Sequence, residues 1–343
     1  IMTATGKGMS LGVLFKDAEA LQKAKNINCI LLDKTATLTV GKPRVTDFQV
    51  FNIVERFALT LAAAIETQSN HPIAECILTF SREKVQEEIA INEYSYEMGK
   101  GATAIYNAQR YYVGNRRLLG ERVQEKARAL EKKYSEEGKT PIFFAKGKQV
   151  LGIIAVADKI KTDSAKAIEE LKRMGIRTVM LTGDNKLSAE TIAKQVGIEE
   201  VLAELKPEQK EKAIVNLQKE GKVAMVGDGI NDAPSLTRAD IGIAIGAGTD
   251  VAIDAADIVL VNSNVSDVGA AIRLSRATLK IIRENLFWAF IYNVICIPVA
   301  AGAFVWAGLT LNPMIGAAAM SLSSFCVVTN ALRLNFFDVR KMK

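Results

Sequence analysis

The sequence is poor in the residue types that form disulfides and most structural metal sites. Its 343 residues contain one histidine and four cysteines, the latter at positions 29, 76, 296 and 326. The cysteines are far apart and none forms a Cys-x-x-Cys pair, which excludes the pattern of a zinc knuckle or of a disulfide framework. We therefore expect free thiols in a reducing compartment. The chain has no internal repeat or low-complexity tract.

The sequence also lacks the pattern of a nucleic-acid-binding surface. Its net charge is +6, but no run of Lys or Arg is interleaved with aromatic residues. Such interleaving is what recognition of bases and phosphates requires. We expect no nucleic acid among the partners.

Charged residues are missing from two long stretches, 286–309 and 313–332. Each stretch is about long enough to cross a ~30 Å hydrocarbon core at ~1.5 Å per residue. The composition is 49% hydrophobic with a mean hydropathy of +0.13, yet 24% of residues are charged, which fits a chain with membrane and soluble parts. We expect two transmembrane helices and a C-terminal tail at 280–343. The alternative is a buried helical hairpin in a soluble protein.

Basic residues flank this hairpin in sequence, whereas its short connector, 310–312, carries no charge. The positive-inside rule therefore places both ends of the hairpin in the cytoplasm of a lipid bilayer. The flanking basic residues are Lys280, Arg283, Arg333, Arg340, Lys341 and Lys343. The chain starts without an initiator methionine or signal segment, so we expect a piece of a longer protein. Residues 1–25 are then a cytosolic extension of a preceding membrane helix.

Most of the remaining sequence is typical of an α/β domain. Short apolar runs that end in Gly or Asp turns indicate strands, and helical patterns at 164–174 and 187–196 lie between some of them. The predicted strands are 27–32, 178–181, 223–226, 241–245 and 258–261. Strands of this kind form a parallel sheet covered on both faces, and ligands bind beyond its carboxyl ends. We assign residues 26–46 and 156–275 to this domain.

Residues 47–155 have a different pattern and form a predicted inserted domain. Charged helix formers at 81–90 and 121–137 predict helices, and alternating segments at 102–113 and 142–156 predict an antiparallel sheet. The fold class is therefore α/β with an inserted α+β domain and a C-terminal transmembrane helical hairpin.

Polar residues gather where the predicted parallel strands end. Asp33 follows the first strand, and its position at a strand tip suits a nucleophile, a metal ligand or a turn former. Asp228 and Asp232 lie in a glycine-containing turn after another strand, where carboxylates can hold Mg²⁺. Thr182 offers a hydroxyl to a phosphoryl oxygen, and Lys210 a positive charge. Together these residues predict phosphoryl transfer.

This set of motifs resembles the P-type ATPases, whose phosphorylation domain is haloacid dehalogenase-like. The resemblance extends over nearly the whole chain. The motifs are Asp33-Lys-Thr-Ala-Thr-Leu-Thr39, Thr182-Gly-Asp-Asn185, Pro207-Glu-Gln-Lys210, Gly227-Asp-Gly-Ile-Asn-Asp232, Gly242-Ile-Ala-Ile-Gly246 and Gly248-Thr-Asp-Val-Ala-Ile253. The resemblance implies that 26–46 and 156–275 form the phosphorylation domain and that 47–155 binds the nucleotide.

The resemblance also implies a role for each motif residue. Asp33 takes the γ-phosphate of ATP and forms an aspartyl phosphate. The implied Mg²⁺ ligands are Asp33, the carbonyl of Thr35, and Asp228. The implied phosphate-binding and site-ordering residues are Lys34, Thr182, Gly183, Asp184, Lys210, Asn231 and Asp232. Soluble phosphatases of this superfamily carry a second acid at the position of Thr35, so the phosphoenzyme here should persist until another domain hydrolyses it.

Within the inserted domain, the segment from Glu66 to Ala74 resembles the ATP-binding signature of the heavy-metal (P1B) subgroup. A lone histidine before proline is more often a helix-entry or loop residue, and the resemblance is what gives His71 a role. It implies that Glu66 and His71 lie near the adenine. The glycines that give the nucleotide access to the backbone are Gly99, Gly101 and Gly114, followed by Asn115.

Polar residues within the predicted membrane helices suggest the transported ion. An asparagine in hydrocarbon is costly and usually faces a partner or a pathway, and a thioether is a soft ligand suited to Cu(I). The residues concerned are Tyr292, Asn293, Met320 and Ser324, each of which alone is more often a packing residue. Together they resemble the exporters of Cu(I) and Ag(I). Cys296 and Cys326 are expected to pack as small apolar residues.

That subgroup implies partners outside this sequence. These are a Cys-Pro-Cys membrane helix before residue 1, an actuator domain that dephosphorylates the aspartate, and a cytosolic metallochaperone that delivers the metal. Other hypotheses are a pump for Zn²⁺ or Cd²⁺, a membrane-tethered phosphatase, and a catalytically impaired regulatory protein. The last rests on Ala36, which stands where the family pattern has glycine. Alanine there strains the loop if its φ is positive, or blocks the incoming phosphate.

Overall fold

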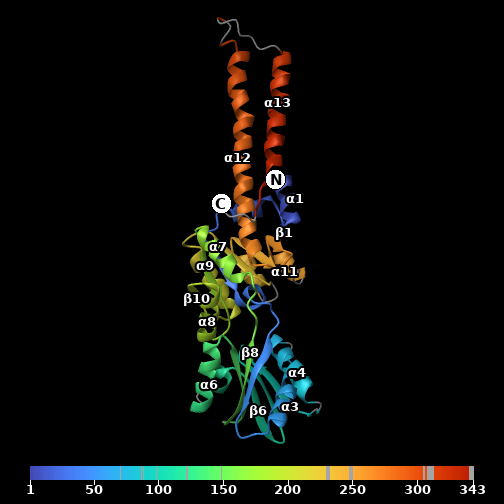
Figure 1. The fold of residues 1–343 in the computed structure, drawn as a ribbon, viewed down its shortest axis with the longest axis vertical. Helices are drawn as coiled ribbons and strands as arrows, with labels where there is room; N and C mark the ends of the chain where they lie inside the picture. The colour runs from blue at the N-terminus through green and yellow to red at the C-terminus, as the bar shows by residue number, and fades with distance from the viewer. Residues whose placement is uncertain are drawn as a thin grey trace.

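The computed structural model describes residues 1–339 except for 70, 86, 88, 98, 121–122, 148, 229–231, 247–249, 304–305 and 307–312. Figure 1 shows three parts in line along the long axis: a helical hairpin, a central α/β domain and an outer domain built on an antiparallel sheet. The N-terminus lies at the base of the hairpin. The order of these parts places the central domain between the hairpin and the outer domain.

The central domain contains a seven-stranded sheet in the order β1-β13-β12-β11-β2-β9-β10. Its strands are β1 (Val13–Phe15), β2 (Cys29–Asp33), β9 (Arg177–Leu181), β10 (Glu200–Leu202), β11 (Val223–Gly227), β12 (Ile241–Ile245) and β13 (Ile258–Leu260). All neighbours are parallel except β1, which pairs antiparallel with β13. The parallel sheet predicted from the apolar runs is confirmed. The edge strand β1 lies within residues 1–25, which we assigned to a membrane-helix extension. The sequence did not predict this strand, because three residues are too few to give a recognisable pattern.

Helices cover both faces of this sheet. Along β2, Ile30 and Leu32 pack into one apolar core and Cys29 and Leu31 into the other, so all of the strand is buried. This explains why β2 is continuously apolar until Asp33. The covering helices are α2 (Ala18–Ala24), α7 (Ser164–Arg173), α8 (Lys186–Val196), α9 (Pro207–Leu217), α10 (Ala233–Arg238) and α11 (Asp250–Ala255).

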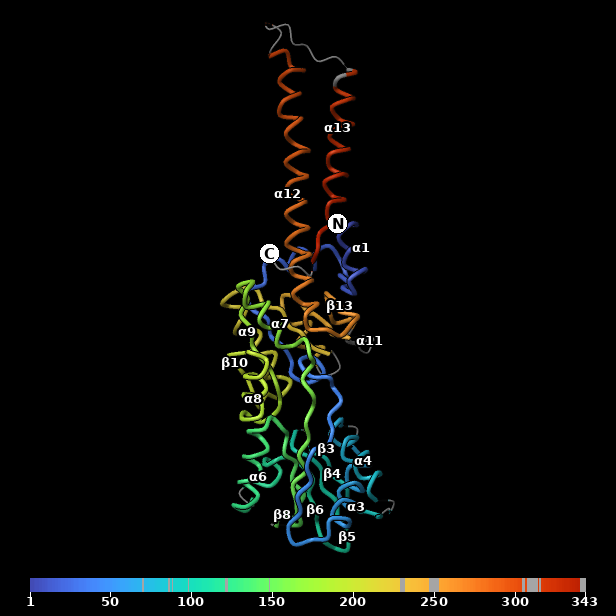
Figure 2. The backbone as a smooth tube through the Cα atoms, viewed as in Figure 1, coloured from blue at the N-terminus to red at the C-terminus, as the bar shows by residue number. Residues whose placement is uncertain are grey.

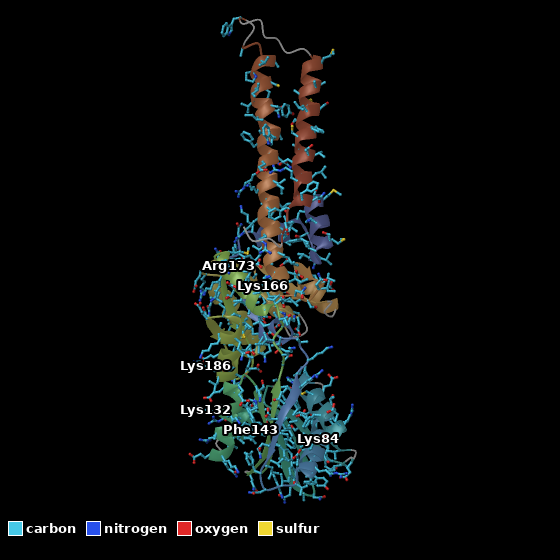
Figure 3. The ribbon with its side chains drawn as sticks, in the orientation of Figure 1. Lys84, Lys132, Phe143, Lys166, Arg173 and Lys186 are labelled. Atoms are coloured by element: carbon cyan, nitrogen blue, oxygen red, sulfur yellow. The ribbon has the colours of Figure 1, made fainter. Side chains whose placement is uncertain are left out.

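The outer domain contains a six-stranded antiparallel sheet in the order β3-β8-β7-β6-β5-β4. Its strands are β3 (Arg44–Val50), β4 (Asn92–Glu97), β5 (Gly101–Tyr106), β6 (Gln109–Gly114), β7 (Thr140–Lys146) and β8 (Gln149–Ala157), and its helices are α3 (Glu55–Glu66), α4 (Pro72–Lys84), α5 (Arg116–Leu119) and α6 (Glu125–Glu136). Alternate residues of β7 serve opposite faces: Phe144 packs with α3 and α4, and Phe143 (Figure 3) packs with α6.

The helix expected at 81–90 is wrong in its position. The structure has α4 from Pro72 to Lys84, and Val85 is already extended with φ −140° and ψ 134°. Residues 81–84 of the expected segment belong to α4, and the helix ends before the buried Val85. Near the other predicted helix, 121–137, the structure places α6 at Glu125–Glu136.

Two connections join the outer and central domains, and they run side by side (Figure 2). Arg44 at the start of β3 pairs with Ala157 at the end of β8, and Thr39 forms a bridge with Ile160. The antiparallel sheet therefore begins at residue 44, slightly before the expected boundary at 47. Both connections leave the central sheet next to the residues that follow β2.

The hairpin consists of α12 (Ser266–Ala300) and α13 (Pro313–Leu332), followed by the short helix η4 (Arg333–Phe336). Both long helices are apolar and long enough to cross a membrane. The first part of α12 is buried in the central domain through residues such as Val268 and Leu274, so one continuous helix belongs to both parts. At the base, Leu334 and Val339 pack with Ala4 of α1 (Met2–Ser10) in a small apolar cluster.

Candidate active site

Asp33 ends β2, with β9 and β11 as its neighbours on either side. Because the strands are parallel, the residues that follow them meet at one edge, and Asp33 pairs directly with Leu181, the residue before Thr182. Asp33 is 6% exposed. The Lys210 Nζ donates to Asp33 Oδ1 at 2.6 Å, and the backbone N–H of Thr35 donates to Oδ2 at 2.9 Å. The nucleophile predicted from sequence is thus held in a fixed orientation.

Lys210 lies between two buried carboxylates. Its Nζ also donates to Asp232 Oδ1 at 2.8 Å, and Asp232 is 1% exposed. Burial would lower the pKa of Lys210, but Asp33 and Asp232 together raise it above the ordinary value. Burial, and next the charge of Asp232, raises the pKa of Asp33 to about 6, while Lys210 opposes the rise. Lys210 therefore does not by itself balance Asp33 and Asp232, and the second cation near Asp33, Lys34, is paired with Asp184.

This excess of negative charge fits a divalent cation. Asp33 and Asp228 offer carboxylates and Thr35 a carbonyl, and these are hard oxygen ligands of the kind Mg²⁺ prefers. The turn after β11 also needs glycine, because a Cβ at Gly227 would lie 2.7 Å from Asp232 Oδ2. Asn231 lies outside the described residues.

The loop after Asp33 adopts an unusual backbone conformation at Ala36. Its φ is +59° and its ψ −10°, in the left-handed region that favours glycine. The Ala36 N–H donates to Thr39 Oγ1 at 3.2 Å, and its carbonyl accepts from Lys161 Nζ at 2.8 Å. A Cβ on Gly41 would lie 2.7 Å from the Ala36 Cβ, so the methyl group is already closely surrounded. These contacts fix the conformation despite its cost.

Two residues that sequence reasoning missed hold this loop. Asp158 accepts from Thr39 Oγ1 at 2.5 Å and from the Gly41 N–H at 3.0 Å. Lys161 donates to Ala36 and also to the carbonyl of Ser263 at 2.9 Å. Both follow β8, on the connection that returns from the outer domain. A charged run directly after a buried strand was the available signal, because that connection has to pass the end of β2.

Thr182 and Asp184 lie beside Asp33, on the turn after β9. Thr182 is 3% exposed, and its hydroxyl accepts from the Asp184 N–H at 3.1 Å. Asp184 forms an ion pair with Lys34, which is itself buried. A Cβ on Gly183 would lie 3.4 Å from the Leu205 carbonyl oxygen, so the turn lies close to the loop after β10. The structure thus brings the Lys34 and Thr182 motifs together as the sequence suggested.

In the outer domain, Glu66 and His71 lie on either side of the α3–α4 connection. Glu66 is 7% exposed, and burial raises its pKa to about 7. His71 caps α4: its Nδ1 accepts from the Ile73 N–H at 3.2 Å. Burial lowers the pKa of His71, and the charge of Asp184 across the domain boundary opposes this effect. His71 therefore lies within range of the charge of Asp184, on the turn after β9 of the central domain.

The predicted nucleotide-binding glycines are brought together by the β5–β6 pairing. Gly101 pairs with Gly114, and a Cβ on Gly101 would lie 2.2 Å from the Val113 carbonyl. Gly101 also has a φ of +138°, so glycine is required there. Asn115 donates from Nδ2 to the Gly99 carbonyl at 2.8 Å. The close approach of the β5 and β6 backbones is what requires glycine at Gly101, whereas a Cβ on Gly99 would meet nothing within 4 Å.

The four residues suggested as ligands of a transported ion lie in the hairpin. Tyr292 and Asn293 are half-buried, and Asn293 Nδ2 donates to the Ala289 carbonyl of its own helix at 3.1 Å. Met320 is 61% exposed, and Ser324 is exposed too. No hydrogen bond described here joins the pair on α12 to the pair on α13. Their role as metal ligands stays a prediction.

The fold and this site define a haloacid dehalogenase-like hydrolase, and the model of that family matches residues 27–240. The chain belongs to this family. Among curated proteins, it is 46% identical to the copper-exporting P-type ATPase of Staphylococcus epidermidis, over all of this chain and 42% of that protein. It is 43% identical to the copper-exporting P-type ATPase of Vibrio cholerae, over 99% of this chain and 38% of that protein.

A solved zinc-transporting PIB-type ATPase in the E2.Pi state is similar in structure. Its TM-score is 0.72 at 35% identity, over 98% of this chain and 54% of that one. Over almost all of its length the chain is thus similar to P-type ATPases, the family that its motifs suggested. It spans less than half the length of the two curated relatives. The copper-exporting relatives and the two apolar helices α12 and α13 support the membrane location expected from the sequence.

Proposed function

We propose that this chain is the catalytic half of a pump that exports Cu(I) at the expense of ATP, through a phosphorylated Asp33. The observation that carries the proposal is the Asp33–Lys210–Asp232 cluster beside Thr182, at the edge of the sheet next to the inserted domain. A buried carboxylate oriented by a lysine and a backbone N–H is arranged for nucleophilic attack. We refer to the central and outer domains below as the phosphorylation and nucleotide-binding domains.

In the proposed reaction, one Asp33 oxygen attacks the γ-phosphorus of ATP, the bond to the bridging oxygen breaks, and ADP leaves with that electron pair. Lys210 and the Thr182 hydroxyl stabilise the charge that spreads over the transferred group. Mg²⁺, held by Asp33, the Thr35 carbonyl and Asp228, would neutralise further negative charge there. Thr35 offers no second acid to activate water. The aspartyl phosphate therefore persists until the proposed actuator domain hydrolyses it.

Nucleotide binding is proposed for the face formed by the paired glycines. Gly99, Gly101 and Gly114 give the nucleotide close access to the backbone, and Asn115 fixes their loop. Glu66 and His71 are proposed to contact the adenine. His71 lies within range of the charge of Asp184 across the domain boundary, which supports a nucleotide that extends from His71 toward the phosphorylation site.

Cu(I) is proposed as the ion because of the chemistry of the hairpin. Met320 offers a soft thioether, and no acidic side chain lies in 285–309 or 313–332, where a Zn²⁺ pump would be expected to have one. The proposed partners are the upstream Cys-Pro-Cys helix, the actuator domain and a cytosolic metallochaperone. The similarity to a zinc-transporting ATPase makes Zn²⁺ the competing ion.

The test uses the full-length protein with radiolabelled ATP and Mg²⁺. We expect Cu(I) to stimulate a hydroxylamine-sensitive phosphoenzyme that Asp33→Asn abolishes. Stimulation by Zn²⁺ and not by Cu(I) would keep the pump and refute the ion. Rapid phosphate release from small esters, without stimulation by metal, would instead indicate a membrane-tethered phosphatase.

A further inference from the structure

The two cytoplasmic domains meet at a contact face that the connections alone do not require. Figure 1 shows α6 of the nucleotide-binding domain directly beside α8 of the phosphorylation domain. Thr191 Oγ1 on α8 lies 3.5 Å from the Ser135 carbonyl on α6. A Cβ on Gly138, just after α6, would lie 3.1 Å from Ile192 Cδ1. The arrangement of the domains is therefore held by side-chain contacts as well as by the two connections.

An ion pair extends this contact face. Arg117 on α5 and Glu204 in the loop after β10 approach to 3.1 Å between Nη2 and Oε2, and the same Nη2 lies 3.4 Å from the Glu204 carbonyl. The two side chains are 43% and 51% exposed. The neighbouring Arg116 pairs with Glu131 of α6 at 3.5 Å, within the nucleotide-binding domain. Of these adjacent arginines, Arg117 crosses the domain boundary and Arg116 does not.

The Arg117 end of the pair is attached to the glycine-lined face. The Arg117 N–H donates to Asn115 Oδ1 at 3.0 Å, and Asn115 Nδ2 in turn donates to the Gly99 carbonyl at 2.8 Å. Arg117 therefore lies two residues after Asn115, on the short helix α5 that Asn115 caps. Movement of this helix would move the proposed nucleotide site with it.

The Glu204 end is attached to the phosphate-binding turn. Glu204 has a φ of +59°, an unfavourable conformation for a residue with a side chain. Its N–H donates to the Asp184 carbonyl at 2.9 Å, and the N–H of Leu205 donates to the Thr182 carbonyl at 3.1 Å. The loop that presents the Glu204 carboxylate is thus hydrogen-bonded to both polar residues of the turn beside Asp33.

We propose that the Arg117–Glu204 pair is an interdomain positioning contact, which holds the nucleotide-binding face toward Asp33. The positioning of the two domains does not depend on the proposed function, whereas its effect on phosphoryl transfer does. ATP bound in one domain has to present its γ-phosphate to a residue of the other, so the fraction of molecules in the closed arrangement scales the rate of phosphoryl transfer. An exposed ion pair of this kind is expected to change the ratio of closed to open molecules by roughly 1.5- to fivefold.

The experiment measures this ratio directly in the nucleotide-free, full-length protein. Spin labels are attached through unnatural amino acids at two exposed positions, Lys84 in one domain and Lys166 in the other (Figure 3), and pulsed EPR gives their distance distribution. We expect Arg117→Ala and Glu204→Ala each to increase the longer-distance population, by roughly 1.5- to fivefold. The double variant should equal the single ones, and the exchange Arg117→Glu with Glu204→Arg should restore the original distribution.

Arg116→Ala is the matched control, because it removes an adjacent arginine whose ion pair stays within one domain. Its distance distribution should match the wild type. The initial rate of phosphoenzyme formation at saturating ATP should fall with Arg117→Ala, by no more than the factor by which the ratio of closed to open molecules falls. Unchanged distances, or effects that add in the double variant, would overturn the proposal. If the wild type forms no phosphoenzyme, the proposed function fails, and the distances still decide whether the pair positions the domains.

Discussion

Ala36→Gly is the substitution that most sharply examines the loop after Asp33. In the structure Ala36 has a φ of +59°, which costs an alanine about 1 kcal/mol that glycine avoids. The greater freedom of glycine in the unfolded chain offsets about 0.4–1 kcal/mol of this gain. We therefore expect a net stabilisation below about 1 kcal/mol, which corresponds to a rise in Tm of less than about 4 °C.

Phosphorylation by ATP should change little in this variant. The Ala36 N–H is bonded to Thr39 and its carbonyl to Lys161, so the loop keeps its conformation with either residue. We expect the phosphoenzyme level to stay within about twofold of wild type, a difference of less than 0.5 kcal/mol on the scale where about 1.4 kcal/mol is tenfold. A rise of about tenfold or more would show that the methyl group obstructs the phosphate. A fall in Tm would contradict the left-handed conformation.

Lys161→Met examines the same loop from its anchor. Loss of the Lys161 ammonium leaves the Ala36 and Ser263 carbonyls without their hydrogen-bond donor, which costs about 1–3 kcal/mol of stability where such groups are buried. The loop should then relax away from the strained conformation, and phosphorylation should fall more in the Ala36 protein than in the Ala36→Gly background. Lys159→Met is the matched control, since Lys159 is exposed on the same connection. Equal losses in the two backgrounds would refute the coupling between Lys161 and Ala36.

Two further predictions concern charges at the site. Lys210→Ala removes the cation between Asp33 and Asp232 and should lower phosphoenzyme formation by at least about a hundredfold. The control is Lys212→Ala, because Lys212 is an exposed lysine on the same helix, and this variant should keep its phosphoenzyme level. Similar losses in both variants would contradict the role of Lys210. The pKa of Glu66 is raised from 4.5 to about 7, so the folded protein keeps a proton that the unfolded chain releases, and stability falls as pH rises through that window. Glu66→Gln should therefore gain stability over wild type between pH 5 and pH 8, by at most about 3 kcal/mol, in thermal unfolding followed across that range. A constant difference at every pH would show that Glu66 does not titrate there.

The strands that position the site could be predicted because they are buried on both faces. The run from Cys29 to Leu32 is apolar throughout, and its end at Asp33 marks the edge where ligands bind. Thr182 and Lys210 were found through their motifs, and the structure brings both toward Asp33. The parallel register, with Asp33 opposite Leu181, explains why residues about 150 positions apart in sequence meet.

The interactions between distant segments could not be predicted in the same way. Asp158 and Lys161 support the loop at Ala36 from the returning connection, and no periodic pattern in the sequence pairs them with residues more than 100 positions away. The positive φ of Ala36 depends on the same tertiary contacts. The Arg117–Glu204 pair joins two exposed, charged residues. The sequence contains many such residues, and most of them contact only solvent, so nothing in the sequence singles out this pair. Helix α4 was misplaced because the charged residues that predicted it lie on both sides of its end at Lys84.

The most direct test of the account identifies the phosphorylated residue itself. The full-length protein is phosphorylated with ATP and Mg²⁺ in the presence of Cu(I), quenched in acid, and treated with borohydride, which reduces an acyl phosphate to an alcohol. Peptide mass spectrometry then locates the modified residue. We expect modification of Asp33, and none of Asp228 or Asp232. A label on a serine or threonine, or on another aspartate, would contradict the assignment of Asp33 as the nucleophile.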